Sequence, residues 1–296
     1  MIEDVKKFLA VSRLAESTRG LYLYHLTLLA QWMDENNIKP RSLTADQLLL
    51  YLDSKKAWGS SSKNLTACAA RAFWGWKYGP KHQVLTVRVR RDDPGPQRTM
   101  NKKEIEQLID VFDTSQAKGV RDLALVMLML DTGIRATEVC TLTMDNLDMG
   151  ERVITVRIKG GSWEPGAFFE YTTACLENWL VIRKQFAAPG VKTVFVSVGG
   201  NTRGKPLTRD GLRATFRKLG LNAGLAETIS PHALRRSFTT LALKAGAPSR
   251  TVQIGGRWAD INMVERYSRK LQVKAMHPYS PSNYVMGVKP KLSDDD

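Results

Sequence analysis

The chain has 296 residues, with 44 Lys and Arg against 29 Asp and Glu, a net charge of +15, and 43% hydrophobic residues. At roughly 100 to 200 residues per domain, this length predicts two domains that each bury their own core, and it excludes a small peptide that depends on disulfides. The longest apolar run, residues 123–130, is far shorter than the roughly 20 residues of a membrane helix, and no export signal is visible, so we expect no membrane span and a cytoplasmic location.

The first domain, residues 1–84, has the apolar spacing of a helical bundle. Apolar side chains recur three and four residues apart, as at Val5 and Phe8, and loop signals divide the segment into about four helices. Thr44, followed three residues later by Gln47, has the pattern of a capping box, which marks the start of one of these helices. The segment therefore predicts a compact helical domain.

A basic linker is predicted at residues 85–98. The stretch holds two prolines, a glycine and four arginines, with few side chains to bury, which favours an extended segment. Both sides of the chain are basic, since residues 1–98 carry 16 basic and 9 acidic side chains and residues 99–296 carry 28 and 20. Because such a surplus attracts phosphate groups, we expect both domains to touch the same polyanion.

The second domain, residues 99–284, is predicted to be helical with a small hairpin across Gly160 and Gly161. The fold class is therefore mostly α with a small β-sheet, in two domains. The tail, residues 285–296, ends in three aspartates and is expected to be mobile. The predicted helices are residues 101–112, 120–132 and 136–142, and the predicted strands are residues 153–158 and 168–172.

No metal site is predicted, and no cofactor is expected. Residues 199–206 nearly spell a phosphate-binding loop, but Pro206 stands where Ser or Thr would hold magnesium. The four histidines lie far apart, without an HxxxH or HExxH motif. Cys68, Cys140 and Cys175 form no CxxC pair, which favours a reduced, intracellular compartment.

Two motifs of the second domain combine polar residues at helical spacing. In TGIRATEV an apolar helix ends at Gly133, and Arg135 and Glu138 then lie three residues apart on one face of the next helix. In PHALRRSF the same spacing places His232 and Arg235 on one face. Taken alone, the first motif is consistent with a surface ion pair and the second with a basic helix surface.

Two further features complete the pattern. Trp258 is followed nine residues later by Tyr267, and Lys159 stands in the turn of the predicted hairpin. Taken alone, the first two residues are consistent with core aromatics, and the lysine with a solvated turn. The order and separations of the four features together are hard to obtain by chance.

On these features the chain resembles the tyrosine recombinase (phage integrase) family over most of its length. The resemblance implies a helical, SAM-like core-binding domain at residues 1–84 and a catalytic domain at residues 99–284. It also implies site-specific cutting and rejoining of double-stranded DNA, for integration, excision or resolution, by a homotetramer on two DNA sites. An accessory factor that sets the direction is a further candidate partner.

The family roles carry over position by position. One position departs from the common pattern, because most members have histidine where this chain has Trp258, and an indole N–H donates a hydrogen bond but cannot shuttle a proton. The matches are Arg135 and Arg235 as the phosphate-binding arginines, Glu138 as a supporting acid, Lys159 as the hairpin lysine, His232 as the histidine of the HxxR pair, Trp258 as a neutral donor and Tyr267 as the nucleophile.

The chemistry explains why such residues are needed. A tyrosine hydroxyl that attacks DNA stores the phosphodiester energy in a phosphotyrosyl bond, so that resealing needs neither metal nor ATP. The resemblance supplies the polarity, a 3′-phosphotyrosine and a free 5′-hydroxyl. His232 suits removal of the Tyr267 proton, and Lys159 suits protonation of the departing oxygen. Tyr279 and Tyr284 compete for the role of nucleophile, but neither keeps the nine-residue offset.

The positive charge of the first domain indicates a role in DNA binding. Basic side chains there and in the linker would let the two domains close around a duplex. Contacts of this kind fix register on DNA without reading its sequence, and any single lysine is also consistent with a solvated face. Two alternatives stay open: a type IB topoisomerase that relaxes supercoils, and a DNA-binding regulator that no longer cuts. The candidate contacts are Lys55, Lys56, Lys63, Arg71, Lys77, Lys81, Arg88, Arg90, Arg91 and Arg98.

Overall fold

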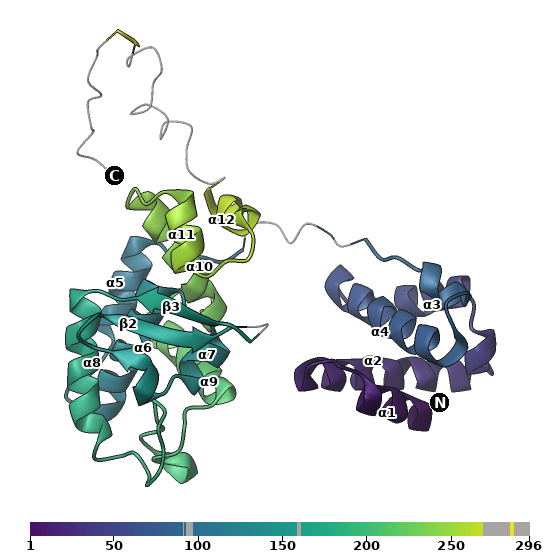
Figure 1. The fold of residues 1–296 in the computed structure, drawn as a ribbon, viewed down its shortest axis with the longest axis horizontal. Helices are drawn as coiled ribbons and strands as arrows, with labels where there is room; N and C mark the ends of the chain where they lie inside the picture. The colour runs from purple at the N-terminus through teal and green to yellow at the C-terminus, as the bar shows by residue number, and fades with distance from the viewer. Residues whose placement is uncertain (91, 93–96, 159–160, 269–284, 287–296) are drawn as a thin grey trace. The chain divides into compact units, whose positions relative to one another are not determined.

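The computed structural model describes residues 1–90, 92, 97–158, 161–268 and 285–286, with the backbone alone at residues 266–268. The chain divides into two compact units, Met1–Pro96 and Gln97–Asp296 (Figure 1). Within the described ranges, no helix is both long enough and apolar enough to cross a membrane.

The first unit is a bundle of helices. Its core is rich in aromatic side chains, with Tyr51, Phe73 and Trp74 fully buried among leucines. The predicted capping box is confirmed, since the Gln47 N–H donates to Thr44 Oγ1 (3.1 Å) and the Thr44 N–H donates to Gln47 Oε1 (3.0 Å). The helices are α1 (Ile2–Val11), α2 (Glu16–Glu35), α3 (Ala45–Ser54) and α4 (Ser60–Tyr78), with 3₁₀ turns η1 (Pro40–Ser42) and η2 (Gln83–Thr86).

The start of the expected linker packs against this unit. Val87 is buried, and Leu85 and Val89 lie against the same core. Arg71 fastens the segment from α4 by donating to the Val87 carbonyl oxygen (3.1 Å). The apolar alternation at these three positions therefore places one side of the segment in the core of the first unit, whereas the sequence predicts a linker from residue 85.

The second unit carries an antiparallel sheet in the order β1 (Leu147–Asp148), β2 (Val153–Arg157), β3 (Trp163–Ala167). Residue 154 pairs with 166 and residue 156 with 164, so that Ile154 and Val156 point into the core. The predicted hairpin is present, but the prediction that its second strand spans residues 168–172 is wrong, because the strand that pairs with β2 is β3.

The chain turns into a helix where that strand was predicted. Phe168 is buried, and the Asp131 carboxylate accepts hydrogen bonds from the Phe169 N–H (3.0 Å) and the Thr172 hydroxyl (2.6 Å). This cap starts α8 at Glu170, so the alternation of residues 168–172 reflects a helix start and not a strand. Burial raises the pKa of Asp131 above its usual value.

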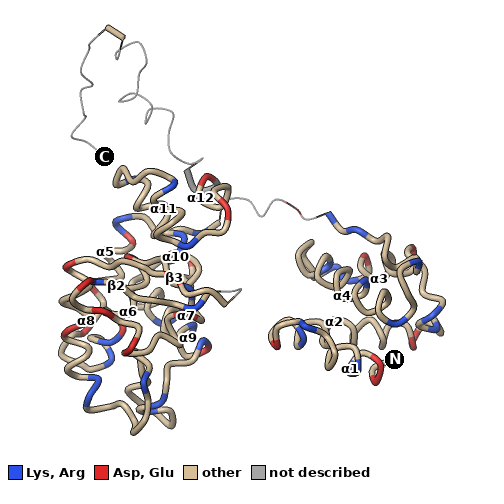
Figure 2. The backbone as a smooth tube through the Cα atoms, in the orientation of Figure 1, with Lys and Arg blue, Asp and Glu red and all other residues tan. Residues whose placement is uncertain are grey.

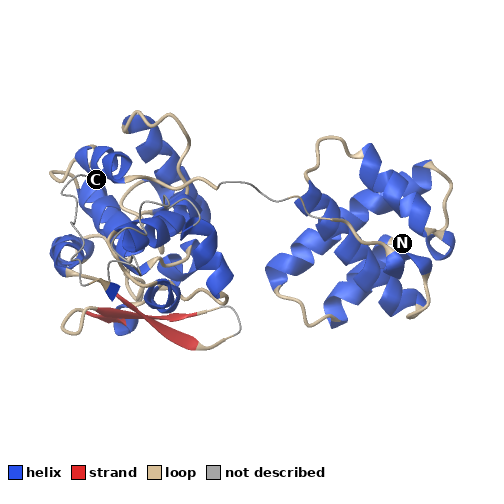
Figure 3. Cartoon of the chain, turned by 90° about the horizontal axis from the view of Figure 1, so that it is seen from above, coloured by secondary structure: helices blue, strands red, loops and turns tan. Residues whose placement is uncertain are grey.

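Helix α6 is the centre of the second unit, and its apolar faces contact both α8 and α10. The sheet lies along one side of the helices (Figure 3), and β3 contacts α6 and α11. The predicted fold class, mostly helical with a small sheet, is confirmed. The helices are α5 (Lys102–Asp110), α6 (Ala117–Thr132), α7 (Ala136–Thr141), α8 (Glu170–Arg183), α9 (Arg209–Asn222), α10 (Pro231–Lys244), α11 (Ser249–Gly255) and α12 (Ile261–Ser268), with 3₁₀ turns η3 (Met144–Asn146) and η4 (Gly200–Thr202).

Candidate active site

The site begins at the turn between α6 and α7. Gly133 ends α6 in the left-handed conformation (φ 57°), and a Cβ at this position would lie 2.7 Å from the Phe238 ring. Glycine is therefore required both by the backbone angle and by the close approach of α10. The turn places Arg135 at the N-cap of α7.

Glu138 holds Arg135 in place. The Arg135 backbone N–H donates to Glu138 Oε2 (2.9 Å), and its Nη1 donates to Oε1 (2.6 Å). The glutamate side chain is only 5% exposed, whereas the arginine side chain is 34% exposed. One edge of the guanidinium is thus fixed by a buried carboxylate, while the group as a whole still reaches solvent.

Arg235 approaches the same turn from α10. Its buried guanidinium donates from Nη1 to the Gly133 carbonyl oxygen and from Nη2 to the Gly256 carbonyl oxygen (2.6 Å). Its central carbon lies 4.2 Å from the centroid of the Trp258 ring, within the range of a cation–π contact. Motifs that are about a hundred residues apart in the sequence therefore meet around one turn.

His232 lies one helical turn before Arg235 on α10 and is solvent-exposed. Partial desolvation, together with the positive charges of Arg236, Arg235 and Arg135, lowers its pKa below the usual value of 6.5. Proton binding to this imidazole is disfavoured because several cations already surround it. The lowered pKa favours the neutral form of His232, the form in which an imidazole can accept a proton.

Trp258 contacts two residues of α10, Thr239 and Arg235. Its indole N–H donates to the hydroxyl of Thr239 (3.1 Å), a buried residue of α10 that the sequence analysis did not single out. The donor expected for a phosphate oxygen is thus engaged inside the protein, while the ring covers Arg235. No sequence pattern marks Thr239, because its partner lies 19 residues away.

Tyr267 lies on α12, and its side chain is outside the described residues. The helix itself packs against α11 and against α10, the helix that carries Arg235, and it follows the short segment that contains Trp258. Lys159 and the two competing tyrosines, Tyr279 and Tyr284, lie outside the described residues.

A second buried arginine that the sequence analysis missed belongs to the site. Arg257 lies beside Trp258, and its carbonyl oxygen accepts a hydrogen bond from Arg135 Nη2 (3.3 Å). Its guanidinium is 3.9 Å from the Glu138 carboxylate. The only available signal is an arginine between a glycine pair and a tryptophan, and this pattern by itself predicts no burial.

The expected DNA contacts of the first unit fall into two groups. Lys56, Lys81, Arg88 and Arg90 are exposed, and Figure 2 shows Lys and Arg positions, in blue, at several places along the backbone of this unit. Arg88 also donates to the carbonyl oxygens of Leu85 (2.5 Å) and Val87 (3.1 Å). The less exposed candidates contact other side chains or the backbone: Lys55 lies over the rings of Tyr51 and Trp58, Lys63 pairs with Asp53, Arg71 bonds the Val87 carbonyl, and Lys77 pairs with Asp4.

The two remaining candidates stand near the unit boundary. Arg98 is held by two carboxylates, with Nη2 at 2.6 Å from Glu104 Oε1 and Nε at 3.3 Å from Glu227 Oε2. These contacts join the start of α5 to the segment before α10. Arg91 lies outside the described residues.

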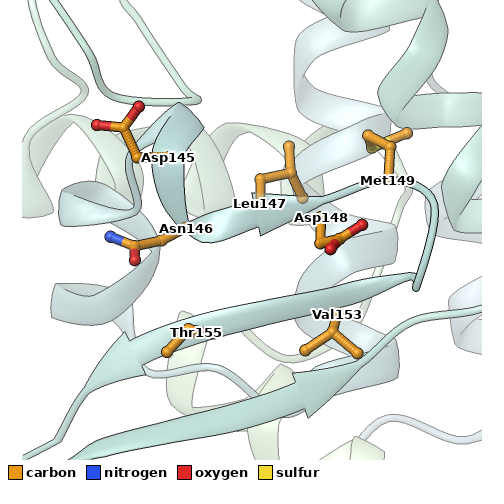
Figure 4. Close-up of a pocket in the computed structure, with 7 residues that line it drawn as sticks. All are labelled: Asp145, Asn146, Leu147, Asp148, Met149, Val153 and Thr155. Atoms are coloured by element: carbon orange, nitrogen blue, oxygen red, sulfur yellow. The ribbon is translucent and has the colours of Figure 1, made fainter.

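A cavity of about 410 Å³ lies along β1 and β2 (Figure 4), and none of its lining residues is Arg135, Glu138, Arg235 or Arg257. Its lining includes the carboxylates of Asp145 and Asp148 and no basic side chain. A lining of this charge repels phosphate, so the cavity does not extend the site. Within the described parts of the chain, no group of three or more His, Cys, Asp or Glu is placed to hold a metal ion.

Comparisons with known proteins identify the family. Residues 98–273, more than half of the chain, match the phage integrase family. The tyrosine recombinase XerD of Listeria monocytogenes serotype 4b (strain F2365) is 28% identical over 292 residues, covering 94% of this chain and 97% of the relative. XerD of Staphylococcus haemolyticus (strain JCSC1435) is 27% identical over 291 residues, with the same coverage.

Solved structures share the fold. The XerH site-specific recombinase, in a post-cleavage complex with a palindromic difH substrate, aligns with a TM-score of 0.71 at 17% identity, over 90% of this chain and 80% of that chain. A lambda integrase dimer bound to a COC′ core site aligns with a TM-score of 0.69 at 17% identity, over 90% of this chain and 94% of that chain. At such identities the likeness concerns the fold.

Proposed function

The chain belongs to the phage integrase family and is a site-specific tyrosine recombinase, and we propose that Arg135, Arg235 and Tyr267 carry its reaction. The observation that supports this assignment most strongly is the hydrogen bond from Arg235 to the carbonyl oxygen of Gly133. It joins the HxxR motif to the turn that positions Arg135, as a shared phosphate site requires.

The two arginines would bind the non-bridging oxygens of the scissile phosphate. The transition state gathers negative charge on these oxygens, and guanidinium groups fixed before the reaction stabilise it without reorganisation. Glu138 holds Arg135 through two hydrogen bonds, which supports its role as the supporting acid. The exposed part of Arg135 gives the phosphate access to the group.

Tyr267 would attack the phosphate, leaving a 3′-phosphotyrosine and a free 5′-hydroxyl that later attacks the partner strand. A tyrosine hydroxyl has a pKa near 10 and must lose its proton in the attack, while the departing oxygen must gain one. His232 suits the first transfer, because its lowered pKa keeps it neutral. Lys159 is assigned the second transfer.

For Trp258 we propose that its ring packs against the guanidinium of Arg235 and holds that group in position. The ring contact at 4.2 Å restricts that guanidinium, and the bond to Thr239 holds the indole in position. Donation to the scissile phosphate, which the sequence predicts, would require this N–H to leave Thr239 first.

The first unit and the linker would complete a clamp on the duplex, through exposed basic side chains such as Lys56 and Arg88. Domain limits at residues 1–84 and 99–284, a homotetramer on two DNA sites and an accessory directionality factor belong to the same proposal. A DNA substrate and three free cysteines support a cytoplasmic location. None of the comparisons favours a topoisomerase or a non-cutting regulator.

Covalent capture tests the assignment. Duplexes with a randomised sequence around a central nick are incubated with the chain, and protein–DNA adducts that survive denaturation are isolated and sequenced. We expect the wild type to select a site and Tyr267→Phe, which lacks only the hydroxyl, to bind that site without forming an adduct. An adduct that persists in Tyr267→Phe would move the nucleophile to Tyr279 or Tyr284, which mass spectrometry of the trapped peptide distinguishes.

A further inference from the structure

We propose that Arg257 is a third cation of the active site, a positioning residue that holds Glu138 and Arg135 from behind and does not contact DNA. This inference rests on the proposed function, because it takes Arg135 as a ligand of the scissile phosphate. Arg257 is neither part of the HxxR pair nor of the TGIRATEV motif.

Arg257 joins the elements that surround the site. Its side chain is 3% exposed, and its guanidinium faces carbonyl oxygens of the protein. Nη2 donates to the carbonyl oxygen of Thr132 at the end of α6 (3.1 Å), and Nη1 donates to those of Pro165 in β3 (3.2 Å) and Gly255 at the end of α11 (3.2 Å). One guanidinium therefore fixes the spacing of three segments behind Arg135.

Arg257 also shares the counter-ion of Arg135. Its Nη2 lies 3.9 Å from Glu138 Oε2, the same oxygen that accepts the Arg135 N–H, and its own carbonyl oxygen accepts from Arg135 Nη2 (3.3 Å). In the cluster of Arg135, Arg235, Arg257 and Glu138, three positive charges face one negative charge. Without Arg257, Glu138 would neutralise Arg135 alone, and the cluster would attract a phosphate less strongly.

The arrangement is costly, which argues for a role beyond packing. Arg257 adopts φ 52°, a left-handed conformation that disfavours side chains with a Cβ. Burial lowers the pKa of its guanidinium, against the opposing influence of Glu138 and of Glu164 in β3. An apolar side chain of similar size fills such a position without the desolvation cost. The charge is therefore best explained by the anion that the cluster receives.

Gly166 in β3 leaves room for this side chain. A Cβ at Gly166 would lie 2.4 Å from Arg257 Nη1, a distance that forces the guanidinium to move. The register of the hairpin thus places a glycine where the guanidinium crosses the sheet. Gly166→Ala consequently displaces Arg257 without changing any charge.

The test uses the duplex that the wild type captures, made once with a normal scissile phosphate and once with a neutral methylphosphonate. We expect Arg257→Met to slow single-turnover adduct formation at saturating DNA by about 10- to 100-fold, by analogy with the loss of residues that orient the ligands of a metal site. DNA affinity should change less than about threefold, because Arg257 does not contact DNA. Arg257→Lys, which keeps the charge, should recover most of the rate.

The methylphosphonate separates an electrostatic role from a structural one. It removes a negative charge from the phosphate, so the missing cation matters less, and we expect the ratio of wild-type to Arg257→Met rates to fall toward one. Arg183→Met is the matched control. Arg183 is also buried and donates to carbonyl oxygens of residues 191, 193 and 194, but it lies outside the cluster. Its loss should lower Tm and leave both rates unchanged.

A double-mutant cycle with Gly166→Ala gives a second, independent readout. Gly166→Ala should slow cleavage in the wild type and have little further effect in Arg257→Met, since the displaced side chain is then gone. If Arg257→Met fails to fold, Gly166→Ala and Arg257→Lys, each compared with the wild type on both duplexes, keep the test open.

Three results would overturn the inference. They are a wild-type cleavage rate in Arg257→Met, an equal loss on phosphodiester and methylphosphonate, and an equal effect of Gly166→Ala in both backgrounds. Failure of the wild type to capture any duplex would instead overturn the proposed function, and this inference with it.

Discussion

The bond between Trp258 and Thr239 distinguishes two roles for the indole. If the ring is a support for Arg235, the Thr239 hydroxyl matters because it holds the ring, and Thr239→Val should impair cleavage as Trp258→Phe does. If the N–H serves the phosphate, Thr239→Val should leave that donor available and cleavage intact. From the observed geometry we expect the first outcome.

The structure gives the size of the effect. Thr239 is fully buried, so removing the indole N–H in Trp258→Phe leaves a buried hydroxyl without this hydrogen bond and costs about 1 to 3 kcal/mol. The same energy in the cleavage barrier corresponds to a rate loss of about 5- to 150-fold. For a unit of this size, each kcal/mol also lowers Tm by about 2 to 4 °C. Trp258→Phe retains an aromatic face for Arg235 but a weaker cation–π contact.

The assay compares both variants on the captured duplex, with adduct formation under single-turnover conditions and Tm measured on the same preparations. Trp258→His is the control for donation, since imidazole presents an N–H but a smaller ring. Wild-type cleavage by Thr239→Val together with a 5- to 150-fold loss in Trp258→Phe would refute the support role and establish the donor role.

Arg135→Ala should slow cleavage by about two to three orders of magnitude with folding intact, the cost of removing one transition-state donor, and a near wild-type rate would remove that arginine from the mechanism. His232 has its folded pKa below the unfolded value of 6.5. The unfolded state therefore binds more protons as the pH falls through about 6.5, so stability should decrease there and level off below the folded pKa. A Tm profile with His232→Gln as reference checks this, and equal profiles would contradict it. Residues 1–96 and 97–296, produced separately, should each bind duplex DNA weakly, and the intact chain far more tightly because the linker makes the second contact intramolecular. Binding should weaken steeply with salt, and a first unit whose binding does not depend on salt would exclude the clamp.

Local features of this protein could be predicted from the sequence. The capping box at Thr44 and Gln47 and the contact of Arg135 with Glu138 involve residues three positions apart, so helix geometry alone brings them together. The family motifs identified the chemistry for the same reason, because each motif occupies a single turn or helix start.

The second strand of the hairpin shows where a prediction from the local sequence pattern fails. Alternation at residues 168–172 is compatible with a strand, but the half-buried carboxylate of Asp131 caps a helix there from 38 and 41 residues away. The linker boundary has a similar cause, since Val87 lies in a core assembled by other helices. Hydrophobic spacing records what a segment can bury, whereas its neighbours decide the conformation in which it is buried.

By itself, the sequence determined the class of fold, the family and the residue types of the site. Only the tertiary structure decided which of these residues face one another. Arg235 reaches Gly133 across 102 residues, and Arg257 reaches Thr132 across 125 residues. Such contacts depend on how α6, α10 and α11 pack, and no spacing along the chain encodes the direction of a buried guanidinium. That packing alone produces the hydrogen bond from the Trp258 N–H to Thr239 and the position of Arg257 behind Glu138.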